Sequence, residues 1–126
     1  MSIVVEPASL AQTIGRYGFA YLMTTNDDGS PHAVAVSVEV EDDGLAVSAV
    51  GGRTRGNALA RPAIGLVWPP QRNDAYSLIV DGQASAAGEG LRIKPTRAVL
   101  HRPAPAPAPR GPGACESDCV PLAITR

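Results

Sequence analysis

The chain has 126 residues, 44% of them hydrophobic and 4% aromatic, and its formal net charge is −1. A chain of this size forms one domain that folds without disulfides or metal, and its near-neutral charge argues against a dedicated nucleic-acid binder. No apolar run reaches the roughly 18 residues of a membrane span, and the N-terminus lacks the features of a secretion signal. We therefore expect a cytoplasmic protein with no membrane contact.

Residues 7–18 are typical of a short amphipathic helix. Leu10, Ile14 and Tyr17 recur at helical spacing, and Pro7 suits a first helical turn. We expect this helix to lie across a sheet.

From residue 19 the hydrophobic period changes to that of strands. We predict strands at 19–25, 31–40, 45–50, 63–68, 76–87 and 91–100. In residues 31–40 valines share one face and mostly small residues share the other, which suits a barrel packed on both sides. Pro95 predicts a break in the last strand, because proline is accepted only at edges and bulges. The expected fold is mainly β, a six-stranded antiparallel β-barrel with small helices.

The composition divides the chain into a domain at 1–101 and a Pro/Ala-rich C-terminal arm at 102–126. The run PAPAPAPRGPG favours extended polyproline conformation and cannot pack a core. The arm either lacks fixed structure or wraps a partner subunit, and the sequence leaves both open. Cys115 and Cys119 lie in the arm, and no second Cys or His pair completes a metal site with them, so we expect no bound metal.

The stretch SAVGGRTRGNALARP, residues 48–62, carries the strongest functional signal. Gly51 and Gly52 permit a positive φ and a close approach of a ligand to the backbone. Arg53 and Arg55 can hold phosphate oxygens with two hydrogen bonds each. A short helix, which we predict at 57–61, adds free N–H groups and the positive end of its dipole.

Two polar side chains of the same stretch, Thr54 and Asn57, can donate further hydrogen bonds. Together these groups predict a phosphate clamp. The alternative interpretation is a solvated surface loop whose arginines bind nothing. The stretch is neither a Walker loop nor a Rossmann fingerprint, because the required glycine spacings are absent.

Residues 44–59, GLAVSAVGGRTRGNAL, resemble the pyridoxamine 5′-phosphate oxidase-like superfamily, the FMN-binding split barrels. In that family an acidic turn with glycine precedes a strand, a Ser-Arg-Lys loop and a short helix, and the resemblance extends over about residues 8–100. It implies a homodimer that holds its cofactor between the two chains. The cofactor-binding residues that it implies are Ser48, Val50, Arg53, Thr54, Arg55, Asn57 and Trp68.

The departures from the family pattern narrow the expected activity. Arg55 replaces a lysine, and Ala33 occupies the place of the phosphate-binding arginine of the oxidase itself, which argues against pyridoxamine phosphate oxidation. The resemblance implies an oxidoreductase that uses FMN or, alternatively, the deazaflavin coenzyme F420, with hydride chemistry supplied by the cofactor and no catalytic side chain. The deazaflavin carries an acidic tail, so additional arginines lining the cofactor groove, such as Arg61 or Arg72, would favour it over FMN.

Several alternatives remain open from the sequence. The protein could be a flavin carrier or sensor without turnover, or a small barrel whose basic loop meets an anionic partner. Trp68 could stack near the cofactor or pack the end of the barrel. His32 stands next to the expected phosphate site, and His101 ends the last strand, where a structural role is expected.

Overall fold

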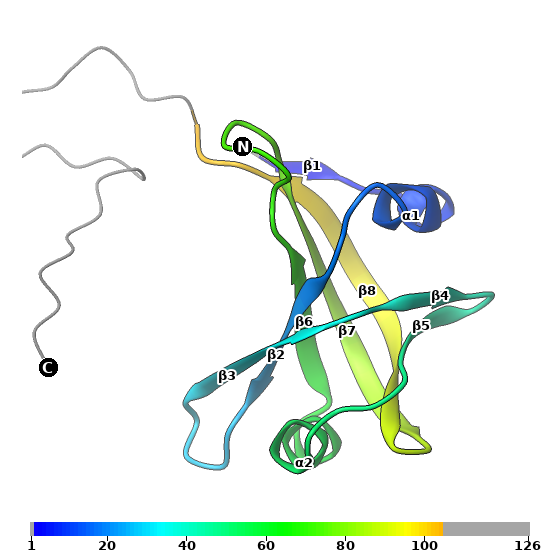
Figure 1. Cartoon of the computed structure of the whole chain (residues 1–126), viewed down its shortest axis with the longest axis vertical. Coiled ribbons are helices and arrows are strands. Elements are labelled where there is room, and N and C mark those ends of the chain that lie inside the picture. The colour runs from blue at the N-terminus through cyan, green and yellow to red at the C-terminus, as the bar shows by residue number, and fades with distance from the viewer. Residues whose placement is uncertain (1, 105–126) are drawn as a thin grey trace, which may run out of the picture.

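A computed structural model describes residues 2–104. This part of the chain contains eight strands and two helices (Figure 1). Their bounds are β1 Ser2–Val4, α1 Pro7–Ile14, β2 Ala20–Thr25, β3 Pro31–Val36, β4 Glu39–Glu41, β5 Gly44–Val47, α2 Gly52–Ala60, β6 Ala63–Trp68, β7 Ser77–Ala87 and β8 Gly90–His101. The Cys115 and Cys119 pair, and the arm from residue 105 onward, lie outside the described residues.

All strand pairs are antiparallel, and the strands follow the order β3-β2-β6-β7-β8-β5-β4, with β1 added to β8. Strands β3 and β4 end this path, yet only residues 37 and 38 separate them in the chain. The strand expected at 31–40 is therefore divided into two, because one half pairs with β2 and the other with β5. The expected mainly β, split-barrel fold is confirmed.

Strand β1 was not expected from the sequence. Its three residues are too few to show an alternation, and all three are exposed. The strand forms because β8 offers it an edge, with Ile3 opposite Leu100 and Val4 opposite Val99.

Alternating side chains of β2, β6, β7 and β8 fill the barrel. Leu22, Leu66, Leu78 and Leu91 are fully buried in it. Trp68 joins this core with only 1% of its surface exposed. Each such side chain stabilises the fold by about 1.5–3 kcal/mol through its removal from water.

Strand β8 continues through Pro95 as one element, with an irregularity in place of the expected break. Asp81 of β7 pairs with Arg97 and Gly82 pairs with Pro95, so Thr96 is an extra residue in the β8 strand. The Thr96 hydroxyl donates a hydrogen bond of 3.2 Å to the carbonyl oxygen of Asp81. The bulge accommodates a residue that lacks an N–H group.

The two helices lie at opposite ends of the barrel (Figure 1). Helix α1 ends at Ile14, before the expected residue 18, and buries Leu10, Thr13 and Ile14. Helix α2 begins at Gly52, five residues earlier than the expected start at residue 57. No helix among residues 2–104 is long and apolar enough to cross a membrane.

Candidate cofactor-binding site

The N-terminus of α2 has no side-chain cap. Gly51, the residue before the helix, is extended with φ −67° and ψ 162°, and no side chain caps the helix. The first intrahelical hydrogen bond runs from the Arg55 N–H to the Gly51 carbonyl oxygen at 3.0 Å. The first turn contains no acidic residue. The N–H groups that precede this bond have no acceptor within the helix, and they carry the positive end of its dipole.

Neither a positive φ nor a close contact requires glycine at three positions of this region. Gly51, Gly52 and Gly56 do not adopt a positive φ, contrary to the expectation for the first two; within residues 2–104 only Gly29 and Gly88 do. A Cβ atom built on any of the three would meet nothing within 4 Å. A glycine inside a helix costs about 1 kcal/mol relative to alanine. At Gly51 and Gly52, which lie at the helix N-terminus, the open space leaves room for a group outside the chain.

The two arginines of the loop differ in their contacts. Arg53 is exposed beside the helix N-terminus. Arg55 is half-buried and donates through Nη2 to the carbonyl oxygen of Gly88, at 3.0 Å, which ties α2 to the β7–β8 turn. The Nε atom of Arg55 is buried and has no hydrogen-bond partner among the described residues. One donor of this guanidinium is thus left for a further acceptor.

Thr54 and Asn57 face the barrel, which corrects the expectation that their side chains face a ligand. They are only 2% and 7% exposed. Thr54 Oγ1 lies 3.2 Å from His32 Nε2, while Asn57 Nδ2 donates to Thr24 Oγ1 at 3.2 Å and to Asn26 Oδ1 at 2.8 Å. Both side chains therefore hold α2 against β2, β3 and the turn between these strands.

An acidic turn between β2 and β3 lies beside the first two turns of α2. The turn and the helix line a hollow of about 620 Å³, formed by Asn26, Asp27, Asp28, Ser30, Gly52, Arg53, Gly56 and Asn57. The Ser30 hydroxyl and backbone N–H donate to the Asp28 carboxylate, and these bonds, with a smaller effect from the positive charge of Arg53, lower the pKa of Asp28. The negative charge of the turn disfavours an anion in this hollow.

The remaining predicted residues separate into two groups. Ser48 is exposed just before Gly51, and Val50 is half-buried against the core, with its N–H 3.4 Å from the Glu89 carbonyl oxygen. The structure thus brings Ser48, Val50, Arg53 and Arg55 to one end of the barrel. Trp68 is buried at the end of β6, opposite Leu78, so its side chain cannot stack on a ligand from this position; packing explains it.

The arginines that would favour a deazaflavin do not line the helix N-terminus. Arg61 follows the C-terminus of α2, where it donates to the Thr25 carbonyl oxygen at 2.8 Å and to Asp27 at 2.7 Å. Arg72 lies between β6 and β7 and pairs with Asp74 at 3.1 Å. Neither residue therefore selects the deazaflavin over FMN.

Sequence reasoning missed one contributor to the site, the turn between β7 and β8. Gly88 has a positive φ of 56° and offers the carbonyl group that Arg55 binds. A Cβ atom on Gly90 would lie 1.8 Å from the Val47 carbonyl oxygen, so only glycine allows this turn to pack against the end of β5. The sequence signal is the pair of glycines in AAGEGL, residues 86–91.

No model of a known protein family matches the sequence. Several solved structures share the fold over most of the chain. An FAD-binding protein of Mesorhizobium loti superposes with a TM-score of 0.64 and 12% identity, over 79% of this chain and 95% of that protein. An F420 reductase gives a TM-score of 0.60 at 16% identity, over 75% and 98% of the two chains. An FAD-binding protein of Mycobacterium smegmatis gives 0.58 at 15% identity, over 81% and 100%.

Two mycobacterial proteins are similar over nearly the whole length. The chain is 37% identical to the uncharacterised protein Mb0449c of Mycobacterium bovis, over 95% of this chain and 96% of that protein. The uncharacterised protein MT0457 of Mycobacterium tuberculosis gives the same identity and coverage. The chain thus shares its fold with these two FAD-binding proteins and the F420 reductase. Within that fold, the chain belongs to the family of these two mycobacterial proteins.

Proposed function

We propose that the protein is a cytoplasmic oxidoreductase that binds FMN, or alternatively coenzyme F420, with the phosphate group at the N-terminus of α2. The observation that carries this proposal is the uncapped, glycine-lined first turn of α2 with Arg53 and Arg55 beside it. The flavin-binding and F420-binding structures that share the fold support it. When bound, such a cofactor supplies hydride transfer to or from a small organic substrate.

The chain's own residues would bind and orient the phosphate. The N–H groups of residues 52–54 and the Arg53 guanidinium donate charge-assisted hydrogen bonds. The Ser48 hydroxyl is exposed at the same end of the barrel and can add another donor. Because Asp27 and Asp28 lie beside Gly52 and Arg53 and repel an anion there, we place the phosphate toward residues 48–51.

Other residues would position these donors. Thr54 and Asn57 fix the helix axis through their buried hydrogen bonds to His32, Thr24 and Asn26. Arg55 holds the β7–β8 turn and leaves its buried Nε–H for an acceptor. Val50 offers an apolar contact. No side chain of this set is a nucleophile, which agrees with chemistry supplied by the cofactor.

We propose that two copies of the chain form a homodimer through the outer face of β2 and β3. On this face Phe19, Tyr21 and Met23 are 47%, 42% and 40% exposed. The small Ala35 and Ala33 stand opposite Tyr21 and Met23 in register and leave space for side chains of a partner. A row of large apolar side chains beside small ones is typical of a protein interface. His32, on the opposite face of β3, contacts Thr54 of α2, so the strand that would form the interface also touches the helix of the proposed cofactor site.

A fluorescence titration with FMN, and separately with F420, tests the proposed function. We expect saturable binding of one cofactor, weakened by about ten- to a hundredfold in Arg53→Ala, because a hydrogen bond from a charged donor is worth about 1.5–3 kcal/mol. The matched control is Arg72→Ala, an exposed arginine far along the chain whose ion pair with Asp74 is also exposed. Absence of binding for both cofactors would overturn the proposal.

A carrier or sensor is the alternative function. It predicts the same binding and the same effect of Arg53→Ala, but no oxidation of the reduced cofactor by any organic acceptor. Stopped-flow mixing of the reduced complex with a panel of small acceptors under anaerobic conditions separates the two functions. Reoxidation at a rate that depends on acceptor concentration would support the oxidoreductase.

A further inference from the structure

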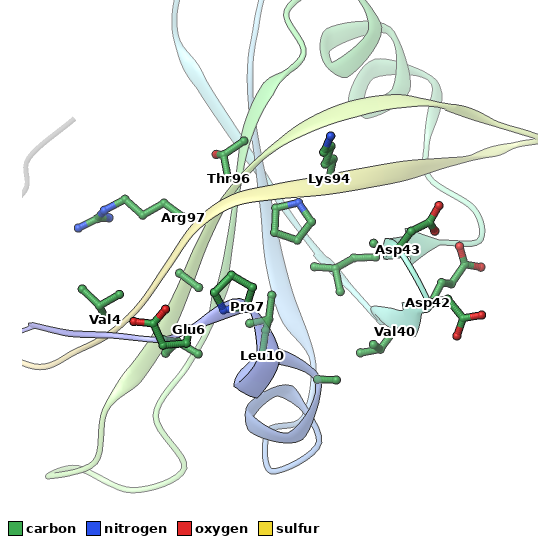
Figure 2. A pocket seen from close by; sticks show the side chains of 17 residues that line it. Val4, Glu6, Pro7, Leu10, Val40, Asp42, Asp43, Lys94, Thr96 and Arg97 are labelled. Carbon is green, nitrogen blue, oxygen red and sulfur yellow. The ribbon is translucent and has the colours of Figure 1, made fainter.

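A second hollow lies at the end of the barrel away from α2. It has a volume of about 500 Å³ and is enclosed by α1, the hairpin of β4 and β5, and β8 (Figure 2). We call it the β8 groove and define it by Pro7, Leu10, Val40, Leu45, Pro95 and Ala98. A volume in the range of about 300–1,000 Å³ is usual for small-molecule sites.

The groove exists because one edge of β8 lacks a partner over a short stretch. Strand β5 pairs with β8 as far as Ile93, and β1 pairs with it from Val99 onward. The Val5 N–H also donates to the Ala98 carbonyl oxygen at 2.8 Å. Within the described chain, Lys94, Pro95 and Arg97 therefore pair with β7 alone, and the bulged Thr96 has no partner in register. The bulge at Thr96 and the missing N–H of Pro95 suit this open edge.

Apolar side chains form the floor and one wall of the groove. Leu10, Leu45 and Ala98 belong to the core and are 8%, 2% and 6% exposed, so the hollow reaches down to the barrel interior. Val40 is 44% exposed across from them. In Figure 2, Leu10 lies between Pro7 and the Val40 side of the groove. An apolar molecule in this space would cover all of these surfaces.

The rim of the groove carries excess negative charge. Its charged residues are Glu6, Glu41, Asp42, Asp43, Lys94 and Arg97. Arg92, just outside, pairs with Glu41 at 3.0 Å and also with Asp43, and Arg97 pairs with Asp81 at 3.7 Å. Among residues 2–104, Glu6 and Asp42 form no ion pair, and the four carboxylates of the rim face two cations, Lys94 and Arg97. The charge of this rim is thus opposite to that of the α2 N-terminus.

We propose that the β8 groove is a ligand site separate from the cofactor site and that it takes a small organic cation, an apolar body of about one ring bearing a protonated amine. The apolar floor would hold the body, while the negative rim, with Glu6 beside α1 and Asp42 in the β4–β5 turn on the opposite side (Figure 2), attracts the amine. The phosphate of a flavin is excluded from this site by the same charges. The proposal is independent of cofactor binding at α2.

The test is a methyl-NMR titration of the full chain with 2-phenylethylamine, alongside 2-phenylethanol and phenylacetate as neutral and anionic probes of similar size. We expect saturable shifts of the Leu10, Leu45 and Val40 methyl groups, with the amine binding about two- to fivefold more tightly than the alcohol, as exposed charge pairs allow. Phenylacetate should bind most weakly. Equal or tighter binding of phenylacetate, or no saturable shifts, would overturn the proposal.

Variants separate this site from its alternatives. Ala11→Trp fills the groove from the exposed side of α1 and should abolish the shifts, whereas Gln12→Trp, on the next exposed position outside the groove, should retain them. Glu6→Gln with Asp42→Asn should remove the preference for the amine and keep binding of the alcohol. If the shifts instead follow protein concentration without any probe, a second copy covers the groove and the proposal fails.

Discussion

The two helices of the barrel are held in place by different kinds of contact. Helix α1 packs through Leu10 and Ile14, which are 8% and 6% exposed. Helix α2 buries Thr54 and Asn57 and is fixed by their hydrogen bonds. Apolar contacts tolerate small rotations of a helix, whereas hydrogen bonds set its direction. This difference shows that α1 mainly closes the core, whereas the hydrogen bonds of α2 fix its orientation. The uncapped N-terminus of α2 is thereby exposed to a ligand.

The largest effect on stability should come from a substitution in α1, the helix held by apolar contacts. Ile14→Ala removes a buried side chain of α1, and we expect a loss of about 2–5 kcal/mol in the free energy of unfolding. Urea denaturation followed by circular dichroism measures it, with the exposed Gln12→Ala as the control. The affinity of the folded variant for FMN should be unchanged. A weaker affinity would show that α1 also positions the cofactor site.

A substitution in α2, the helix held by polar contacts, should lower stability less and should also weaken FMN binding. Asn57→Ala deletes the bonds to Thr24 and Asn26 and leaves the buried Thr24 hydroxyl without this partner, at a cost of about 1–3 kcal/mol. Because α2 is then free to turn, FMN should bind more weakly. The exposed Leu59→Ala is the matched change on the same helix. Unchanged FMN affinity in Asn57→Ala would contradict the inference that Asn57 fixes the orientation of α2 for binding.

Gly56→Ala should stabilise the protein. The position is exposed inside α2, with open space for a Cβ atom, and alanine is favoured over glycine by about 1 kcal/mol. We expect a higher urea midpoint and an unchanged FMN dissociation constant, because Gly56 lies one turn beyond the first N–H groups. Reduced FMN affinity in this variant would show that the ligand contacts α2 as far as residue 56.

Gly51→Asp should separate stability from binding. A carboxylate at this position caps the free N–H groups and interacts with the helix dipole, which adds about 0.3–1 kcal/mol of stability. The same carboxylate occupies the proposed phosphate position and repels the ligand, so FMN affinity should fall. Denaturation and titration of one preparation show both changes. A variant that gains stability and still binds FMN normally would refute the placement of the phosphate.

The smallest effect concerns pH. The pKa of Asp28 is lowered below its usual 3.8 by the bonds from Ser30, so the folded state favours the charged carboxylate. The stabilisation is present above pH 3.8 and is lost as the pH falls through the folded-state pKa below it. In Ser30→Ala the acid limb of the stability curve should shift slightly upward in pH. Identical curves for the two proteins would contradict this role of Ser30.

The sequence predicted most strands because their side chains alternate. Leu22, Leu66 and Leu78 each sit in a run with a period of two, and all three are buried as that pattern indicates. The division of residues 31–40 could not be predicted, since the valine pattern continues across residues 37 and 38 while the pairing partner changes. Such a change depends on strands distant in the sequence.

The sequence did not predict where α2 begins, because the first residues of this helix include glycines. Gly51, Gly52 and Gly56 have low helix propensity, and they favoured a loop. The burial of Thr54, Asn57 and Ala58, at helical spacing, determines the helix in the structure, but two of these residues are polar and resemble ligand contacts in a sequence. The arginines were evident in the sequence. The position of the uncapped end and the side chains that face inward were not, because they depend on the hydrogen bonds to β2 and β3.

The most direct test of the central claim compares the dissociation constants of FMN and riboflavin, which differ only in the phosphate group, for the unmodified protein. The account predicts that FMN binds more tightly by at least about tenfold, since charge-assisted hydrogen bonds at α2 reach the phosphate alone. Coenzyme F420 and its chromophore without the phosphate-bearing side chain provide the same comparison if the deazaflavin is the one that binds. Equal affinities within the pair that binds would contradict the account and leave the N-terminus of α2 without a ligand.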